Sequence, residues 1–197
     1  MREEQALGWA ELECALAYKK CSPENLNQMI QIFFSHGFKV HEKYKFGAFT
    51  LEGDDLILAE DASYNDFIQE ITNVKCNVAV VNLWGSLHDL QAKISLCFFP
   101  KYRVITISSR ENFIWGHGNN LKLSNINRVI AFFALCKEIC KLLPPKYAFI
   151  SSEEAHPDEI NVENAEENGF APYDEKMFSD ESAWKMLNWY LKTYGAE

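Results

Sequence analysis

The chain has 197 residues, of which 48% are hydrophobic and 14% aromatic, so it can fold around a sizeable core as one domain. Its 19 basic and 28 acidic side chains give a net charge of −9, which argues against a general nucleic-acid or anionic-membrane binder because both need clustered Lys and Arg. No run approaches roughly 18 apolar residues, and the first residues, MREEQALGW, lack the apolar core of a secretory signal, so we expect a cytoplasmic protein without a membrane span.

The first third of the chain is expected to contain two helices followed by strands. A helix is expected over residues 3–20, with Leu7, Trp9, Leu12, Ala15 and Leu16 as its apolar residues and Glu3, Glu4, Glu11, Glu13, Lys19 and Lys20 as its polar ones. Ser22-Pro23 is a helix start, and Gly37 suits the end of that second helix.

From Phe38 the apolar period changes to two, which indicates strands. The turn at residues 52–55 is expected to join residues 48–51 and 56–59 as a hairpin. Ser63 is then expected to cap a short helix.

Residues 76–150 form the central block of the predicted fold. Three apolar, β-branched runs predict strands at Asn77–Leu83, Lys93–Phe99 and Tyr102–Ser108, with a loop or one helical turn over residues 84–91. Residues Asn125–Leu143 predict a long helix whose apolar arc is too broad for an ordinary surface helix, so a sheet must cover it. Another short strand is expected at Tyr147–Ser151.

The composition becomes strongly acidic after this block. Eleven acidic side chains and one basic side chain occur between residues 153 and 181. Ser179 is expected to cap a terminal amphipathic helix that carries Trp184 and Leu187. We therefore divide the chain into a core domain, 1–152, and an acidic segment with a C-terminal helix, 153–197, packed on the same domain.

Runs of strands interrupted by single helices, without regular βαβ alternation, predict an α+β fold. We expect a mainly antiparallel sheet of about five or six strands, with helices packed on one face and further helices at both ends of the chain.

Six cysteines occur without any CxxC pair, mostly inside apolar runs, so reduced and buried thiols are expected. Cys136 and Cys140, one turn apart on the long helix, are expected to serve core packing and not metal binding. His88 and Asp89 are adjacent in the sequence. Side chains of neighbouring residues on a strand do not point at each other, so this pair is weak evidence for a catalytic dyad. No cofactor or metal is expected.

The segment from Trp115 to Asn120 has two glycines on either side of His117. The glycines would allow a ligand to approach the backbone, and the imidazole could act as an acid, a base or a metal ligand. The alternative is a loop whose glycines and asparagines supply turn conformations before the helix.

The segment from Glu153 to Glu159 places carboxylates beside His156. Their spacing fits neither a calcium loop nor a zinc helix, and such charge runs are usually solvated surface. An enzyme, if this is one, would be a hydrolase or transferase using His117, Glu153 and His156.

The favoured interpretation is an acidic protein-binding module, such as an inhibitor or immunity-type protein, that masks a basic partner through steered association. The side chains expected to bind are Glu163, Glu166, Glu167, Trp84 and Trp115, because exposed Trp residues often anchor interfaces. A third alternative is a structural subunit that docks through the C-terminal helix. No nucleic acid or membrane is expected among the partners.

Overall fold

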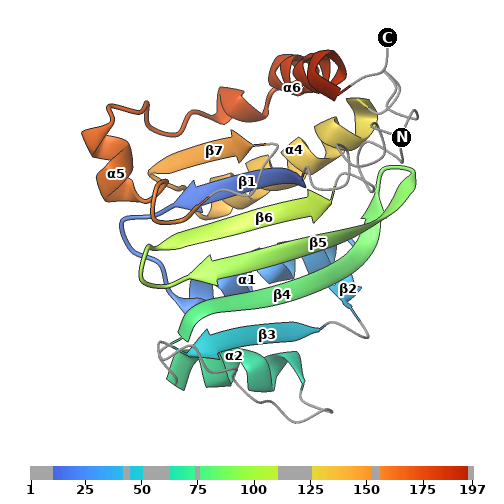
Figure 1. Ribbon diagram of the computed structural model, residues 1–197. Coiled ribbons are helices and arrows are strands. Elements are labelled where there is room, and N and C mark those ends of the chain that lie inside the picture. The colour runs from blue at the N-terminus through green and yellow to red at the C-terminus, as the bar shows by residue number, and fades with distance from the viewer. Residues whose placement is uncertain are drawn as a thin grey trace, which may run out of the picture.

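A computed structural model describes residues 11–41, 45–50, 63–73, 76–110, 126–151 and 156–194. Seven strands form one antiparallel sheet in the order β2-β4-β5-β6-β1-β7, with β3 also paired to β4 (Figure 1). The strands are β1 Glu11–Ala17, β2 Lys39–Val40, β3 Phe46–Thr50, β4 Cys76–Leu87, β5 Leu90–Phe99, β6 Val104–Arg110 and β7 Tyr147–Ser151. The α+β fold with an antiparallel sheet is confirmed.

Among the described helices, one face of the sheet is covered by α1 (Pro23–Ser35), α2 (Tyr64–Asn73) and α4 (Ile126–Leu142). Figure 1 shows α1 and α4 behind the strands. Eight of the seventeen residues of α4 are buried, as its broad apolar arc predicted. Phe67 of α2 stacks on Phe46 of β3 with ring centroids 4.7 Å apart, which attaches the β3 edge to the same core.

The helix predicted over residues 3–20 is wrong for its described part, because residues 11–17 form strand β1. This strand lies between β6 and β7; it pairs with β6 along its whole length and with β7 from Glu13 to Ala17. Leu12, Cys14 and Leu16 alternate with Glu13 and point into the main core, so a period of two was present in the sequence. Pairing on both sides outweighs the local pattern that favoured a helix.

The interval predicted as a loop or helical turn over residues 84–91 belongs instead to a long hairpin. Strands β4 and β5 continue until Leu87 pairs with Leu90, leaving His88-Asp89 as the turn. His88 has a φ of 58°, a left-handed conformation that histidine adopts more readily than most residues. Residues 51–62, which include most of the other predicted hairpin, lie outside the described residues.

The second face of the sheet is defined by the strand register. Ala17, Val104 and Tyr147 form a separate buried cluster there with Val162 and Ala165. These last two belong to α5 (Val162–Glu167), so α5 packs on the face opposite to α1, α2 and α4.

The remaining C-terminal elements are the 3-10 helix η3 (Glu175–Phe178) and helix α6 (Asp180–Tyr194). Ser179 Oγ accepts a hydrogen bond from Ser182 N, so the predicted cap is confirmed. Ala183 and Leu187 of α6 and Phe178 of η3 are buried in the main core, mainly against α4. Among the described helices, none has the length and apolarity that a bilayer crossing requires.

Candidate functional site

Helix α5 is short, but both of its ends are closed by hydrogen bonds. Asn161 Oδ1 accepts from Asn164 N at 3.1 Å, which caps the first turn. At the other end Phe170 N donates to Ala165 O at 3.0 Å and Gly169 N donates to Glu166 O at 3.1 Å. These two bonds, with Gly169 at a φ of 67°, are the Schellman arrangement, and they fix the direction in which Phe170 leaves the helix.

The outer side of this region carries five exposed carboxylates and one exposed aromatic ring. Phe170 is 50% exposed, and its ring meets Phe149 of β7 edge-on with centroids 5.5 Å apart. We call the set the acidic α5 surface; it comprises Asp158, Glu159, Glu163, Glu166, Glu167 and Phe170.

One of the five carboxylates is anchored to the sheet. Arg103, in the turn between β5 and β6, donates from Nη2 to Glu163 Oε1. This hydrogen bond holds the pKa of Glu163 below its ordinary value. Within the described parts of the chain the other four carboxylates form no ion pair, so most of the negative charge of this surface is uncompensated.

The predicted binding residues are distributed over two surfaces. Glu163, Glu166 and Glu167 all lie on the acidic α5 surface, whereas Trp84 lies on β4, 38% exposed, with its ring edge-on to His41 at 5.9 Å. Trp115 lies outside the described residues. Sequence reasoning missed Phe170, although Asn168-Gly169 followed by an aromatic residue is the usual signal of a helix end with a hydrophobic contact.

The residues of the enzyme alternative are not brought together by the described structure. His117 and Glu153 lie outside the described residues. His156 is exposed, in a turn where its carbonyl oxygen accepts hydrogen bonds from the backbone of Glu159 and Ile160. No described group of three or more His, Cys, Asp or Glu side chains could hold a metal ion.

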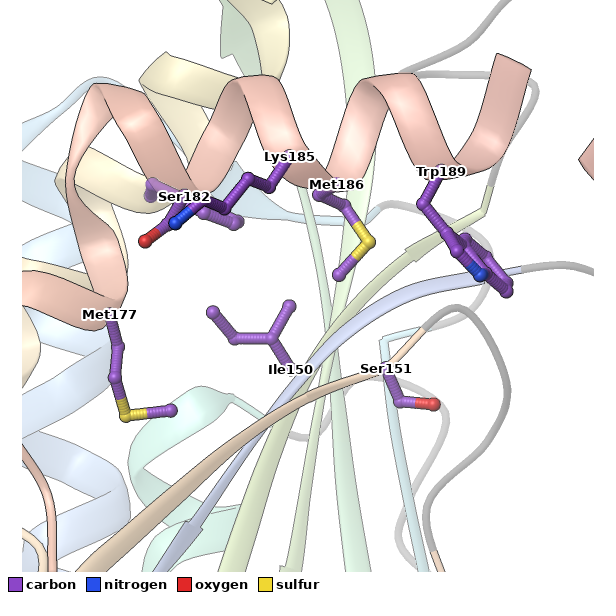
Figure 2. A pocket seen from close by; sticks show the side chains of 8 residues that line it. Ile150, Ser151, Met177, Ser182, Lys185, Met186 and Trp189 are labelled. Carbon is purple, nitrogen blue, oxygen red and sulfur yellow. The ribbon is translucent and has the colours of Figure 1, made fainter. Parts of the chain in front are cut away.

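A cavity of about 470 Å³ lies between edge strand β7 and helix α6. Figure 2 shows Ile150, Met177 and Met186 directing their side chains into this space, with Trp189 at one end. Ser151, Ser182 and Lys185 supply its polar groups and Phe133 its remaining apolar wall. The volume suits a small molecule or one large apolar side chain.

A smaller cavity of about 260 Å³ lies between α1, α4 and the β4–β5 hairpin. His36 Nε2 is 2.8 Å from Glu138 Oε2 at its rim. His88 Nδ1 is 3.2 Å from Asp89 Oδ1, so this adjacent pair does make contact, because it occupies a turn and not a strand. Hydrogen bonds from Arg128, and secondarily from His88, lower the pKa of Asp89 far below its usual range.

The cysteines provide no reactive centre. All six are free; four are buried and Cys21 and Cys97 are half-buried. Burial raises the pKa of Cys21 to about 12 and that of Cys14 well above its ordinary value, so these sulfurs stay as unreactive thiols.

No family model matches the chain, and neither a curated protein nor a solved structure is significantly similar to it.

Proposed function

We propose that this protein is a binding module of the inhibitor or immunity type, which masks a basic partner with the acidic α5 surface. The observation that supports the proposal is the exposure of five carboxylates together with that of Phe170 on one short stretch of chain. Glu163, Glu166 and Glu167 lie on α5, whose ends are fixed, and Asp158 and Glu159 lie in the turn before it. Every other described carboxylate between residues 156 and 194 is also exposed, so the segment presents its charge to solvent.

Charge and aromatic surface have different tasks in such an interface. Uncompensated exposed carboxylates raise the association rate with a basic partner, typically by about 10-fold to 1,000-fold at low salt. A half-exposed aromatic ring supplies desolvated contact area, which slows dissociation. Phe170 is already ordered by Gly169 and Phe149, so little conformational freedom is lost when it binds.

Glu163 is expected to hold α5 against the sheet as well as to contribute charge to the interface. Its carboxylate is bound to Arg103, so reversing its charge would also remove that contact between α5 and the β5–β6 turn. The informative substitutions are therefore Glu166→Lys and Glu167→Lys, since both side chains are exposed and form no described ion pair.

The experiment compares E166K/E167K with the matched control E24K/E70K, which changes the net charge equally on helices α1 and α2. Each tagged protein captures partners from an extract of its native cell at about 50 mM salt, and captured proteins are identified by mass spectrometry. We expect a basic protein to be retained by the unchanged chain and the control, and lost from E166K/E167K.

Purified partner then gives the association rate. A steered interface predicts that the association rate of the unchanged chain falls at least about 10-fold between 50 and 500 mM salt. At 50 mM salt E166K/E167K should associate more slowly than the control, and its rate should depend less on salt, because it has lost part of the attraction that salt screens. Equal capture by both variants, or a partner without a basic surface, would refute the proposal.

A further inference from the structure

The cavity between β7 and α6 has apolar walls that belong to three separate elements. Ile150 comes from β7, Met177 from η3 and Met186 from α6, and Figure 2 shows all three side chains directed into the space. Each of them is only half-buried, although each also packs against the main core. Apolar surface therefore surrounds an open space of about 470 Å³, which lies within the range of roughly 300–1,000 Å³ that is usual for small-molecule sites.

Helix α6 is held in a position that keeps this cavity open. Ala183 and Leu187 of α6 are fully buried in the main core. Phe178 of η3 meets Phe133 of α4 edge-on, with ring centroids 5.7 Å apart, and Ser179 caps the first turn of α6. Moving α6 towards β7 would withdraw these side chains from their packed positions, so the cavity is a fixed part of the fold.

The polar groups of the described lining already have partners. Lys185 Nζ is 2.7 Å from Glu181 Oε1, so the positive charge beside the cavity is neutralised. Ser182 Oγ donates to Lys176 O at 3.0 Å, and Ser151 has an interaction of its own. A charged ligand would lose its hydration here without gaining an oppositely charged partner, which costs free energy. The lining therefore selects an uncharged occupant.

We propose that this cavity binds an uncharged aromatic small molecule, and that its volume admits two fused rings. Methionine side chains are flexible and polarisable, and their sulfur atoms make favourable contacts with the edges of aromatic rings. Two of the four methionines in the chain, Met177 and Met186, line this one cavity, and the Phe133 ring adds a further apolar wall. A compound of the size of naphthalene should bind with a Kd of about 10–100 µM.

This inference is independent of the proposed function. Ile150 packs against the core that α4 covers, whereas the acidic α5 surface belongs to the opposite face of the sheet. Binding of a small molecule is measured on the purified full chain without a protein partner, so either proposal can fail without the other.

The test uses N-phenyl-1-naphthylamine, an uncharged aromatic probe whose fluorescence rises in apolar surroundings. We expect saturable binding of one probe per folded chain. Naphthalene-2-methanol should displace the probe at least about 10-fold better than naphthalene-2-carboxylate, which has the same rings but carries a charge. Absence of saturable binding, or equal displacement by the two compounds, would overturn the inference.

Substitutions then locate the probe. Met186→Trp fills the cavity and should weaken probe binding at least about 10-fold. The matched control is Leu142→Trp, at an exposed apolar residue about 13 Å further along α4 than Phe133, and it should bind the probe like the unchanged chain.

Circular dichroism shows whether each variant is folded. If Met186→Trp does not fold, M177A/M186A replaces it; this double variant removes both flexible walls and should weaken binding at least about 5-fold. A folded cavity variant that binds the probe as tightly as Leu142→Trp would place the probe elsewhere and refute the assignment of the site.

Discussion

Gly85 is the position where one added methyl group should disturb the core most clearly. A Cβ atom built at Gly85 would lie 2.5 Å from both Cγ and Cδ1 of Phe38 and 2.9 Å from Cδ2. Carbon atoms in contact are normally about 3.5–4.0 Å apart, so the ring would have to retreat by about 1 Å. Phe38 is 2% exposed and its ring is held edge-on by Phe33 at 5.4 Å, which leaves little room to retreat.

The expected cost of Gly85→Ala follows from two opposing effects. Overpacking a dense core costs about 1–3 kcal/mol, and restricting the unfolded chain by replacing Gly with Ala recovers about 0.5–1 kcal/mol. The net loss in the free energy of unfolding should be about 1–2 kcal/mol. For a urea m-value of about 2 kcal/mol/M this lowers the midpoint by about 0.5–1 M.

Urea denaturation followed by circular dichroism measures this change, with Gly47→Ala as the control. Gly47 lies on β3 with no atom within 4 Å of its built Cβ, so its substitution should show only the gain from the restricted unfolded chain and raise stability by about 0.5–1 kcal/mol. Phe38→Leu removes the ring, and G85A/F38L should be more stable than the sum of the single losses predicts. Equal stabilities of G85A and G47A, or strict additivity with F38L, would refute the steric reasoning.

Three further outcomes are expected. Arg128→Ala should raise the pKa of Asp89 towards 3.8, measured by NMR titration; the folded-state pKa is depressed, so the variant should be less stable above about pH 4 and converge with the unchanged chain in strong acid. Gly169→Ala should cost about 1 kcal/mol, because a φ of 67° strains an L residue, and should weaken any binding that uses Phe170; a variant as stable as the unchanged chain would contradict the assigned Schellman geometry. A thiol reagent at pH 8 should modify Cys14, Cys76, Cys136 and Cys140 slowly in the native protein and all six cysteines after unfolding; fast native reaction at any of these four, located by peptide mass spectrometry, would show that its burial is wrong.

The elements with strong local signals were predictable from the sequence. Strand β7 begins and ends where predicted, and α4 differs from its predicted range by one residue at each end. The apolar arc of α4 and the prolines after it leave few alternatives to a helix of that length. Residues 11–17 were misassigned because Leu12, Ala15 and Leu16 have the spacing of one helical face, while the pairing that makes β1 a strand comes from residues about 90 and 135 positions away.

The candidate site was predictable only in part, for a similar reason. The acidic composition identified Glu166 and Glu167, since charge runs are surface features whatever the fold. The grouping of Lys39, Trp84 and Lys93 could not be found from composition, because these three residues become neighbours only through the register of three strands. The contact between Arg103 and Glu163 likewise joins residues 60 positions apart.

The position of β1 has a consequence for how the chain is made. Strand β1, which ends at Ala17, lies between β6 and β7. During synthesis both edges of β1 can therefore be paired only after residue 151 has left the ribosome. At about 5–20 residues per second this interval lasts on the order of ten seconds, in which an apolar strand has unsatisfied backbone groups. Nascent chains stalled before β7 should therefore depend on chaperones, and release should coincide with synthesis of the acidic C-terminal segment.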